Sequence, residues 1–366
     1  MKHILFVTNF PSPYKVDFYD ELSKSVQLTV LYSDKIEDQL HRDKDWFTES
    51  KTGFRSVQLK KQVAHFLGEN LCLDVIDWLK KPYDAIVVCG YSSPTAILAM
   101  AYLRLHRIPF YMEVDGGLIR QDSRLKHFVK KSLVCLANRW LSTGVHTTKY
   151  LVHYGAREEN VTHYPFSSLY AGDILEKPVS QAEKTELRRE LEIPEKHMIL
   201  AIGQMIHRKG FDVLLKAAGK LDPEIGIYFV GGEAKEEYRK LREELGPEHV
   251  HFLGFQKKDR LAKFYKASDL FVLPTREDIW GLVINEALAY GLPTITTDRC
   301  VAGLELIEDG INGYVVPVED VEALAEKIQA VLESDMEAMG KAALEKVRPY
   351  TLENMAKTHA EIFEGE

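Results

Sequence analysis

The sequence predicts an α/β fold made of two Rossmann-like domains, and three observations lead to this prediction. The chain has 366 residues, which suits two domains better than one core. Short, almost continuous apolar runs alternate with helical patterns, as in parallel sheets covered by helices on both faces. The alternation forms two sets, which implies two such sheets in tandem.

The first set begins with the apolar run at residues 3–9, which we read as a first buried strand rather than a signal peptide. Later runs predict further strands at 26–33, 85–90, 109–114, 139–144 and 161–166. Helical patterns at 15–24 and 93–106 lie between them. We therefore expect residues 1–178 to form the first Rossmann-like domain.

The second set repeats this scheme after a polar stretch without a strand, residues 171–196. Its strand-like runs are 198–204, 225–232, 249–255, 270–275, 293–298 and 313–318, and its helical patterns include 210–221, 236–246, 260–268 and 321–333. We expect residues 179–349 to form the second domain. The tail 350–366 is expected to be a terminal helix that packs back on the first domain.

Bulk composition narrows the class of protein. The 45% hydrophobic and 28% charged residues are those of a globular protein, and no apolar run has the length of a membrane span. The four cysteines lack paired or metal-like spacing, which favours reduced thiols and a cytosolic location. The first strand is followed by no G-x-G-x-x-G, and G-x-x-x-x-G-K-[ST], G-x-S-x-G and H-E-x-x-H are missing, so those classes of enzyme gain no support.

Basic residues gather in residues 120–131, where they alternate with apolar ones at helical spacing. Two interpretations stay open. The segment is either a solvated helix face packed on a core, or a contact with an anionic membrane surface or a phosphate-bearing acceptor.

Two cations follow the strand-like run that ends at Gly203. Arg208 and Lys209 stand beside the start of a helical pattern, where amide donors, helix dipole and side-chain charge add together at an anion such as a diphosphate. The alternative is a solvent-exposed basic loop. Gly231, in the run at 225–232, lets backbone approach a flat ligand, although any tight turn would use it.

The stretch 276–295 carries acids around a helix start. Glu277 and Asp278 precede Gly281, near which we expect the helix to begin. The free amides of Gly281, Leu282 and Val283 would point at an anion, with no side chain at Gly281 in its path. Glu286 lies about 7 Å further along the helix axis, about the span from a diphosphate to a ribose. A sugar nucleotide fits this layout.

With these motifs, the second half of the chain resembles the family 4 retaining glycosyltransferases of the GT-B fold. Six segments match in order and spacing and cover most of residues 198–317: GQMIHRKGFDVLLKA, YFVGG, VHFLGF, YKASDLFVLPT, EDIWGLVINEALAYGLPTI and EDGINGYVV. The first half matches only loosely. The resemblance implies two Rossmann-like domains whose parallel sheets face a central cleft, with the acceptor bound by the first domain and the nucleotide sugar by the second.

The resemblance also implies roles for individual residues. Arg208 and Lys209 would neutralise the diphosphate, and Glu286 would hold the ribose. Asp278 takes the first acidic position of the family's E-x7-E motif, where the family has Glu, so that either Asp278 or Glu277 meets the sugar. Gln204 replaces a frequent arginine, and Arg208 is a candidate source of that charge.

In the first half, Asp115 stands where many relatives carry a histidine near the donor sugar. It contacts the donor sugar or the acceptor, or it is a turn acid beside two glycines. The predicted catalytic residues are thus Arg208, Lys209, Asp278 and Asp115, and the predicted substrate-binding residues are Glu286, Glu277, Gly281, Leu282, Val283, Gly203, Gln204, Gly231, Phe255, Pro13 and Tyr14.

The function expected from this resemblance is retaining transfer of a sugar to a hydroxyl of a saccharide or lipid-linked saccharide, in surface polysaccharide biosynthesis. The donor is a nucleoside-diphosphate sugar, UDP ahead of GDP. We expect no cofactor, metal or nucleic-acid partner, and a cytoplasmic enzyme that is peripheral at the inner face of the plasma membrane. Two alternatives stay open: a sugar-nucleotide epimerase of the same fold, and a non-catalytic nucleotide-sugar-binding subunit.

Overall fold

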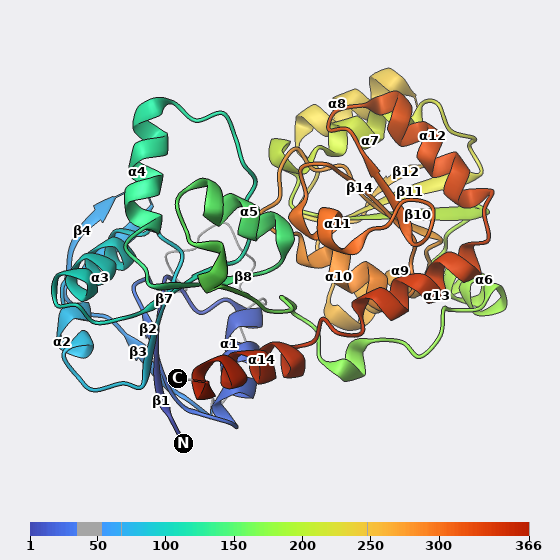
Figure 1. The fold of residues 1–366 in the computed structure, drawn as a ribbon. Helices are drawn as coiled ribbons and strands as arrows, with labels where there is room; N and C mark the ends of the chain where they lie inside the picture. The colour runs from blue at the N-terminus through green and yellow to red at the C-terminus, as the bar shows by residue number, and fades with distance from the viewer. Residues whose placement is uncertain (35–52, 67, 247, 366) are drawn as a thin grey trace. The chain divides into compact units, whose positions relative to one another are not determined.

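The structure, a computed structural model, describes residues 1–34, 53–66, 68–246 and 248–365. It divides into two compact units (Figure 1). The N-terminal unit comprises Met1–Ser168 and Tyr350–Glu366, and the C-terminal unit comprises Leu169–Pro349. Each unit has its own parallel sheet and its own hydrophobic core.

The N-terminal unit is built on a seven-stranded sheet in the order β3-β2-β1-β6-β7-β8-β9, with every neighbouring pair parallel. The strands are β1 His3–Thr8, β2 Gln27–Tyr32, β3 Arg55–Gln58, β6 Ala85–Cys89, β7 Tyr111–Val114, β8 Arg139–Ser142 and β9 Val161–His163. A separate antiparallel hairpin joins β4 Gln62–Phe66 to β5 Glu69–Cys72.

The helices of this unit connect the parallel strands and cover the sheet. They are α1 Pro13–Ser23, α2 Val75–Leu79, α3 Pro94–Leu105, α4 Arg124–Val134, α5 Val145–His153, the 3-10 turn η3 Glu158–Asn160 and, from the end of the chain, α14 Leu352–Glu364. Apolar residues of β1, β6 and β7 pack against α3 in a buried core, which explains why those strands read as continuous apolar runs.

The C-terminal unit repeats this plan with a six-stranded parallel sheet in the order β12-β11-β10-β13-β14-β15. Its strands are β10 His197–Gly203, β11 Ile225–Gly231, β12 Val250–Phe252, β13 Leu270–Leu273, β14 Thr294–Thr297 and β15 Gly313–Val316. Its helices are η4 Ala171–Asp173, α6 Gln181–Glu190, η5 His207–Lys209, α7 Phe211–Ala218, α8 Glu236–Leu245, α9 Lys258–Ala267, α10 Leu282–Ala289, α11 Val301–Leu306, α12 Val321–Leu332 and α13 Met336–Val347.

The last helix returns to the N-terminal unit. In α14, His359 is fully buried and lies among the rings of Phe18, Tyr164 and Phe363. Among the described residues, no helix has both the length and the apolar character needed to cross a bilayer.

These two parallel sheets confirm the predicted α/β fold with two Rossmann-like halves. Every apolar run predicted as a strand contains one. The polar stretch 171–196, by contrast, contains the helix α6, because Arg188 of that helix is buried against Asp269 and the carbonyl of Ala267.

Candidate functional site

Two segments of the C-terminal unit meet at the carboxyl edge of its sheet, where open α/β sheets bind ligands. The turn η5 follows β10, and the loop 274–281 follows the neighbouring strand β13. Together they form a cluster of Arg208, Lys209 and Asp278, which we call the cation cluster. Lys209 Nζ lies 2.5 Å from one carboxylate oxygen of Asp278, and Arg208 lies 3.4 Å from the other.

The cation cluster is fixed by backbone hydrogen bonds. Arg208 also donates to the carbonyl oxygen of Glu277 at 2.7 Å, while its own carbonyl accepts from the amide of Arg276 at 2.8 Å. Arg276 in turn forms two 2.7 Å hydrogen bonds to the carboxylate of Asp212 at the start of α7. These hydrogen bonds to Asp212 are the main cause of the raised pKa of Arg276, so Arg276 stays charged. The turn therefore holds both cations at one edge.

The helix α10 begins directly after this loop, with Gly281 as its N-cap. The first amides of a helix have no acceptor within it, so those of Leu282 and Val283 are free to meet an anion. The structure gives Gly281 a reason other than ligand access. Its φ is +103°, and a Cβ there would lie 2.8 Å from Cys300 Sγ, inside the protein.

Glu286 sits one turn into α10 and is partly buried. One carboxylate oxygen accepts a 2.8 Å hydrogen bond from the hydroxyl of Tyr265 in α9, and Tyr265 stacks on Tyr290. Burial raises the pKa of Glu286, and the hydrogen bond from Tyr265 offsets only part of that shift. The other carboxylate oxygen has no hydrogen-bond partner among the described residues. It is available to a hydroxyl group.

The remaining predicted residues of the C-terminal unit lie at or just after the ends of β10, β11 and β12. Gly203 and Gly231 are partners in register, and a Cβ on Gly231 would meet the carbonyl oxygen of Gly203 at 2.1 Å. The side chain of Lys209 runs over Gly203, where an added Cβ would lie 3.4 Å from its Cε. Gln204 follows directly, and Phe255 is exposed in the loop after β12. The absence of a side chain at Gly203 and Gly231 thus lets β10, β11 and the side chain of Lys209 pack closely at this edge.

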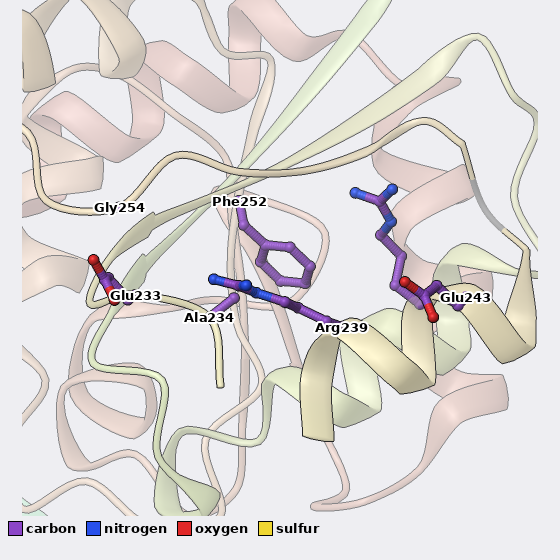
Figure 2. Close-up of a pocket in the computed structure, with 7 residues that line it drawn as sticks. Glu233, Ala234, Arg239, Glu243, Phe252 and Gly254 are labelled. Atoms are coloured by element: carbon purple, nitrogen blue, oxygen red, sulfur yellow. The ribbon is translucent and has the colours of Figure 1, made fainter. Parts of the chain in front are cut away.

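A hollow of about 360 Å³ opens beside the same strand ends (Figure 2). Figure 2 shows Arg239 of α8 extending toward Glu233 and past the ring of Phe252. The hollow is lined by Glu233, Ala234, Arg239, Arg242, Glu243, Phe252 and Gly254. None of the residues predicted from the sequence lines it, so it is separate from the cation cluster.

In the N-terminal unit, the predicted residues gather around an ion pair. Pro13 is the first residue of α1, and Tyr14 packs edge-on against Phe166 at 5.7 Å. Lys15 lies 3.4 Å from the carboxylate of Asp115, which follows β7. Burial opposes the charge on Lys15, but Asp115 together with Tyr14, Cys89 and Glu113 outweighs this effect and keeps the lysine pKa above its usual range. Burial raises the pKa of Tyr14 to about 12.

Asp115 has a raised pKa, mainly because of burial, with Lys15 opposing the shift and Glu113 adding to it. Glu113, two residues earlier, accepts from Cys89 Sγ at 3.0 Å and lies 3.0 Å from Nε2 of His359. Burial would raise the pKa of Glu113, but the hydrogen bond and charge of His359, together with Cys89 and Lys15, outweigh burial and lower it. The N-terminal unit therefore holds one carboxylate firmly ionised and a second that is poised to protonate more easily.

Comparison with known proteins identifies what this arrangement resembles. Residues 183–346 match the model of the family described as glycosyl transferases group 1. An uncharacterised glycosyltransferase of Methanocaldococcus jannaschii is 30% identical over 269 residues, which are 68% of this chain and 65% of that protein. A D-inositol 3-phosphate glycosyltransferase of Mycobacterium sp. strain KMS is 32% identical over 166 residues, which are 43% of this chain and 37% of that protein. The chain thus spans less than two thirds of the length of either relative.

Among solved structures, Alr3699/HepE of Anabaena in complex with UDP superposes over 100% of both chains, with a TM-score of 0.78 and 17% sequence identity. The fold is GT-B. The family match covers residues 183–346, and the likeness to this structure shows the fold of the chain.

Within this GT-B chain, sequence reasoning missed three residues that the structure places in contact with predicted ones. They are Lys15 beside Asp115, Tyr265 on Glu286, and Arg276 behind the turn of Arg208. Lys15 could have been predicted from the sequence, because it directly follows the predicted residues Pro13 and Tyr14. Tyr265 had no local signal, since it lies 21 residues before Glu286.

Proposed function

We propose that this protein is a retaining glycosyltransferase that moves a sugar from a nucleoside-diphosphate sugar to a hydroxyl group of an acceptor. The observation that carries the proposal is the order of groups along one edge of the C-terminal unit. The cation cluster comes first, the start of α10 follows, and Glu286 lies about one turn further on. This order suits a sugar, a diphosphate and a ribose in turn.

The cations and the helix start suit the charge that develops during transfer. When the bond between the sugar C1 and the diphosphate oxygen breaks, negative charge grows on the leaving diphosphate. Arg208, Lys209 and the first amides of α10 are oriented before the reaction, so they would stabilise that charge without reorganising. The acceptor oxygen bonds to C1 on the face that the diphosphate leaves, and its proton passes to the departing phosphate oxygen. We propose that these side-chain cations suffice without a metal ion.

Asp278 has a double role in this proposal. Without donor it neutralises Lys209 and Arg208, at 2.5 and 3.4 Å. When the diphosphate takes over these cations, the carboxylate is released to accept hydrogen bonds from the donor sugar. This supports Asp278, rather than Glu277, as the acid that meets the sugar.

For the donor we propose UDP ahead of GDP. Alr3699/HepE has been solved with UDP and with UDP-glucose, and the likeness to that protein in fold supports the choice. For the acceptor we propose a saccharide or lipid-linked saccharide bound near Asp115 and Tyr14, at the cytoplasmic face of a membrane, in the assembly of a surface polysaccharide.

A donor screen tests the proposal. Thermal unfolding is measured with UDP, GDP and a panel of their sugars, because a ligand at about 100 times its Kd adds roughly 2.7 kcal/mol to stability. We expect one nucleotide sugar to raise Tm, and that donor then to react with saccharide and lipid-linked saccharide acceptors in the presence of EDTA. The anomeric configuration of the product is read by NMR.

The variant Glu286→Ala should weaken donor binding sharply in the same assay. Glu326→Gln is the matched control, because Glu326 is an exposed acid on α12 of the same unit. A donor that binds but is only epimerised, with no acceptor needed, would replace transfer with isomerisation. Binding without any turnover would reduce the protein to a nucleotide-sugar-binding subunit.

A further inference from the structure

The exposed face of α4 in the N-terminal unit is a surface that the proposed transfer reaction does not use. Three apolar side chains of this helix lie in solvent: Leu125 is 73% exposed, Phe128 67% and Val129 47%. At 100° per residue they fall within an arc of about 100°. Val134, at the far end, is the buried residue of the helix. The helix thus turns its apolar side outward.

Basic residues border this apolar arc on both sides. Arg124 and Lys131 project next to Phe128, and Lys126 projects next to Val129. Residues 116–135 contain five Lys or Arg and a single acid, Asp122, although the whole chain has a net charge of −8. The side chain of Asp122 is 2% exposed and is neutralised by Lys126 and Lys130. The surface around α4 is therefore cationic within an acidic protein.

The orientation of α4 is fixed from below by Lys130. Its Nζ lies 2.8 Å from the carboxylate of Asp122, donates to the hydroxyl of Tyr154 at 3.2 Å, and sits 4.7 Å from the centroid of that ring. Tyr154 also donates to Asp122 at 2.5 Å. Because this cation faces inward, the helix cannot roll to bury Leu125 and Phe128 without breaking the network.

We propose that this face of α4 docks onto an anionic lipid bilayer. An apolar arc flanked by cations is the pattern of a helix that lies in the membrane interface, with its apolar side among the acyl chains and its lysines and arginines at the phosphates. Phe128 and Leu125 enter the bilayer, and Arg124 and Lys131 hold the headgroups, while Lys126 stays paired with Asp122. This docking rests on the geometry of α4 alone and is independent of the proposed transfer reaction.

Vesicle sedimentation of the full chain tests this docking. We expect the protein to pellet with vesicles of phosphatidylcholine and phosphatidylglycerol, and much less with phosphatidylcholine alone. The variant Leu125→Ser/Phe128→Ser should lower the partition coefficient by about tenfold or more, since each buried methylene contributes about fourfold. Arg124→Gln/Lys131→Gln should lower it about 25-fold on the anionic vesicles, at about fivefold for each cation.

The controls are chosen from the C-terminal unit. Ile311→Ser removes an apolar side chain that is 48% exposed, and Lys240→Gln/Lys341→Gln removes two cations that are 65% and 60% exposed. All variants are first shown to unfold at the temperature of the parent protein. In Phe128→Trp, anionic vesicles should shift the new emission to the blue, and brominated acyl chains should quench it.

Three results would overturn the docking. They are no partition onto anionic vesicles, equal loss in the control variants, or self-association of the free protein that Leu125→Ser/Phe128→Ser abolishes. The last result would assign this face to a second copy of the chain. UDP binding is measured on each variant in parallel, so that a failed nucleotide site is recognised separately from failed docking.

Discussion

Asp278 is the residue whose charge most directly opposes the anionic donor. Before a donor binds, its carboxylate forms ion pairs with both cations of the cation cluster, and a diphosphate must replace it there. Asp278→Asn removes a negative charge next to the diphosphate, so we expect the Kd of UDP to fall. Transfer should slow at the same time, because the donor sugar loses a carboxylate. Calorimetry with UDP and a turnover assay measure the two effects.

The control for this variant is Asp259→Asn, an exposed acid in the first turn of α9. It should change neither quantity. Weaker binding of UDP to Asp278→Asn would show that Asp278 organises the cations instead of competing for them.

Lys209 provides the second prediction at this scale. Its ammonium lies within the cation cluster and its stem runs over Gly203, so Lys209→Met keeps much of the apolar contact and removes the charge. Losing one such donor typically costs about 3 to 4 kcal/mol of transition-state stabilisation, a fall in kcat of about 10²- to 10³-fold. A steady-state assay with the identified donor measures it, with Lys216→Met on α7 as control. A kcat within about threefold of the parent would remove Lys209 from the mechanism.

Glu286 connects function with stability. Burial raises the pKa of Glu286, so the protonated form is favoured in the folded state and the ionised form destabilises the fold. The stability that the protonated form contributes is present at low pH and is lost as the pH rises through the raised pKa. Glu286→Gln keeps an acceptor for Tyr265 without the charge. We therefore expect it to raise Tm at neutral pH while it weakens donor binding. Thermal unfolding with and without UDP reports both, and a lower Tm in the ligand-free variant would contradict the assignment.

At this scale, the sequence predicted the functional residues whose neighbours in the chain mark them as such. Arg208 and Lys209 were recognisable because they adjoin a strand end and a helix start. The contacts that hold their side chains in place come from 69 residues away, through Asp278 and the carbonyl of Glu277. No spacing rule connects those positions, and the partnership of Lys209 with Asp278 emerges only when β10 and β13 become neighbours.

At the scale of the element, α14 places the buried side chain of His359 in the core of the N-terminal unit. His359 donates from Nδ1 to the carbonyl of Met355 at 2.8 Å, and its Nε2 lies 3.0 Å from the carboxylate of Glu113. The result is a hydrogen-bonded pair with 0% and 3% exposed side chains. Removing one member of such a pair leaves a buried charge, at a typical cost of about 3–5 kcal/mol.

We therefore expect His359→Leu to destabilise the N-terminal unit by about 3–5 kcal/mol in urea unfolding at neutral pH. Because the pKa of Glu113 is lowered, the pair stabilises the fold above the ordinary glutamate pKa, and this contribution is lost as the pH falls through the lowered value. The difference in the free energy of unfolding between the parent and His359→Leu should become smaller at acidic pH. Glu113→Leu/His359→Leu should recover much of the loss, and a gap that is constant with pH would point to packing alone.

The sequence predicted the strands that are buried on both faces, and the elements that it missed lack such burial. The apolar runs at 3–9 and 198–204 became β1 and β10, in the middle of their sheets. The helix α6 was missed because its mean character is polar, and it is held by Arg188 against Asp269 instead of by an apolar face. The hairpin of β4 and β5 was missed because it stands apart from the main sheet and its strands are short.

At the scale of the whole molecule, the chain crosses between its two units twice. It leaves the N-terminal unit after Ser168 and returns to it at Tyr350, so the last helix completes a core that the first strand began. The proposed donor groups all belong to the C-terminal unit, and Asp115 and Lys15 belong to the N-terminal one. Because the two sets lie on separately packed cores, a change in one set should leave the other intact.

This separation leads to a prediction about Lys15. Lys15→Met removes the ammonium 3.4 Å from Asp115, and since Lys15 opposes the burial that raises the pKa of Asp115, that pKa should rise further. Transfer that needs the ionised carboxylate should then fall at neutral pH and return as the pH increases, moving the acidic limb of the pH profile of kcat/KM upward. UDP affinity should be unchanged, and Lys15→Arg should keep the parent profile. A loss of UDP binding in Lys15→Met would show that the two units act on the donor together.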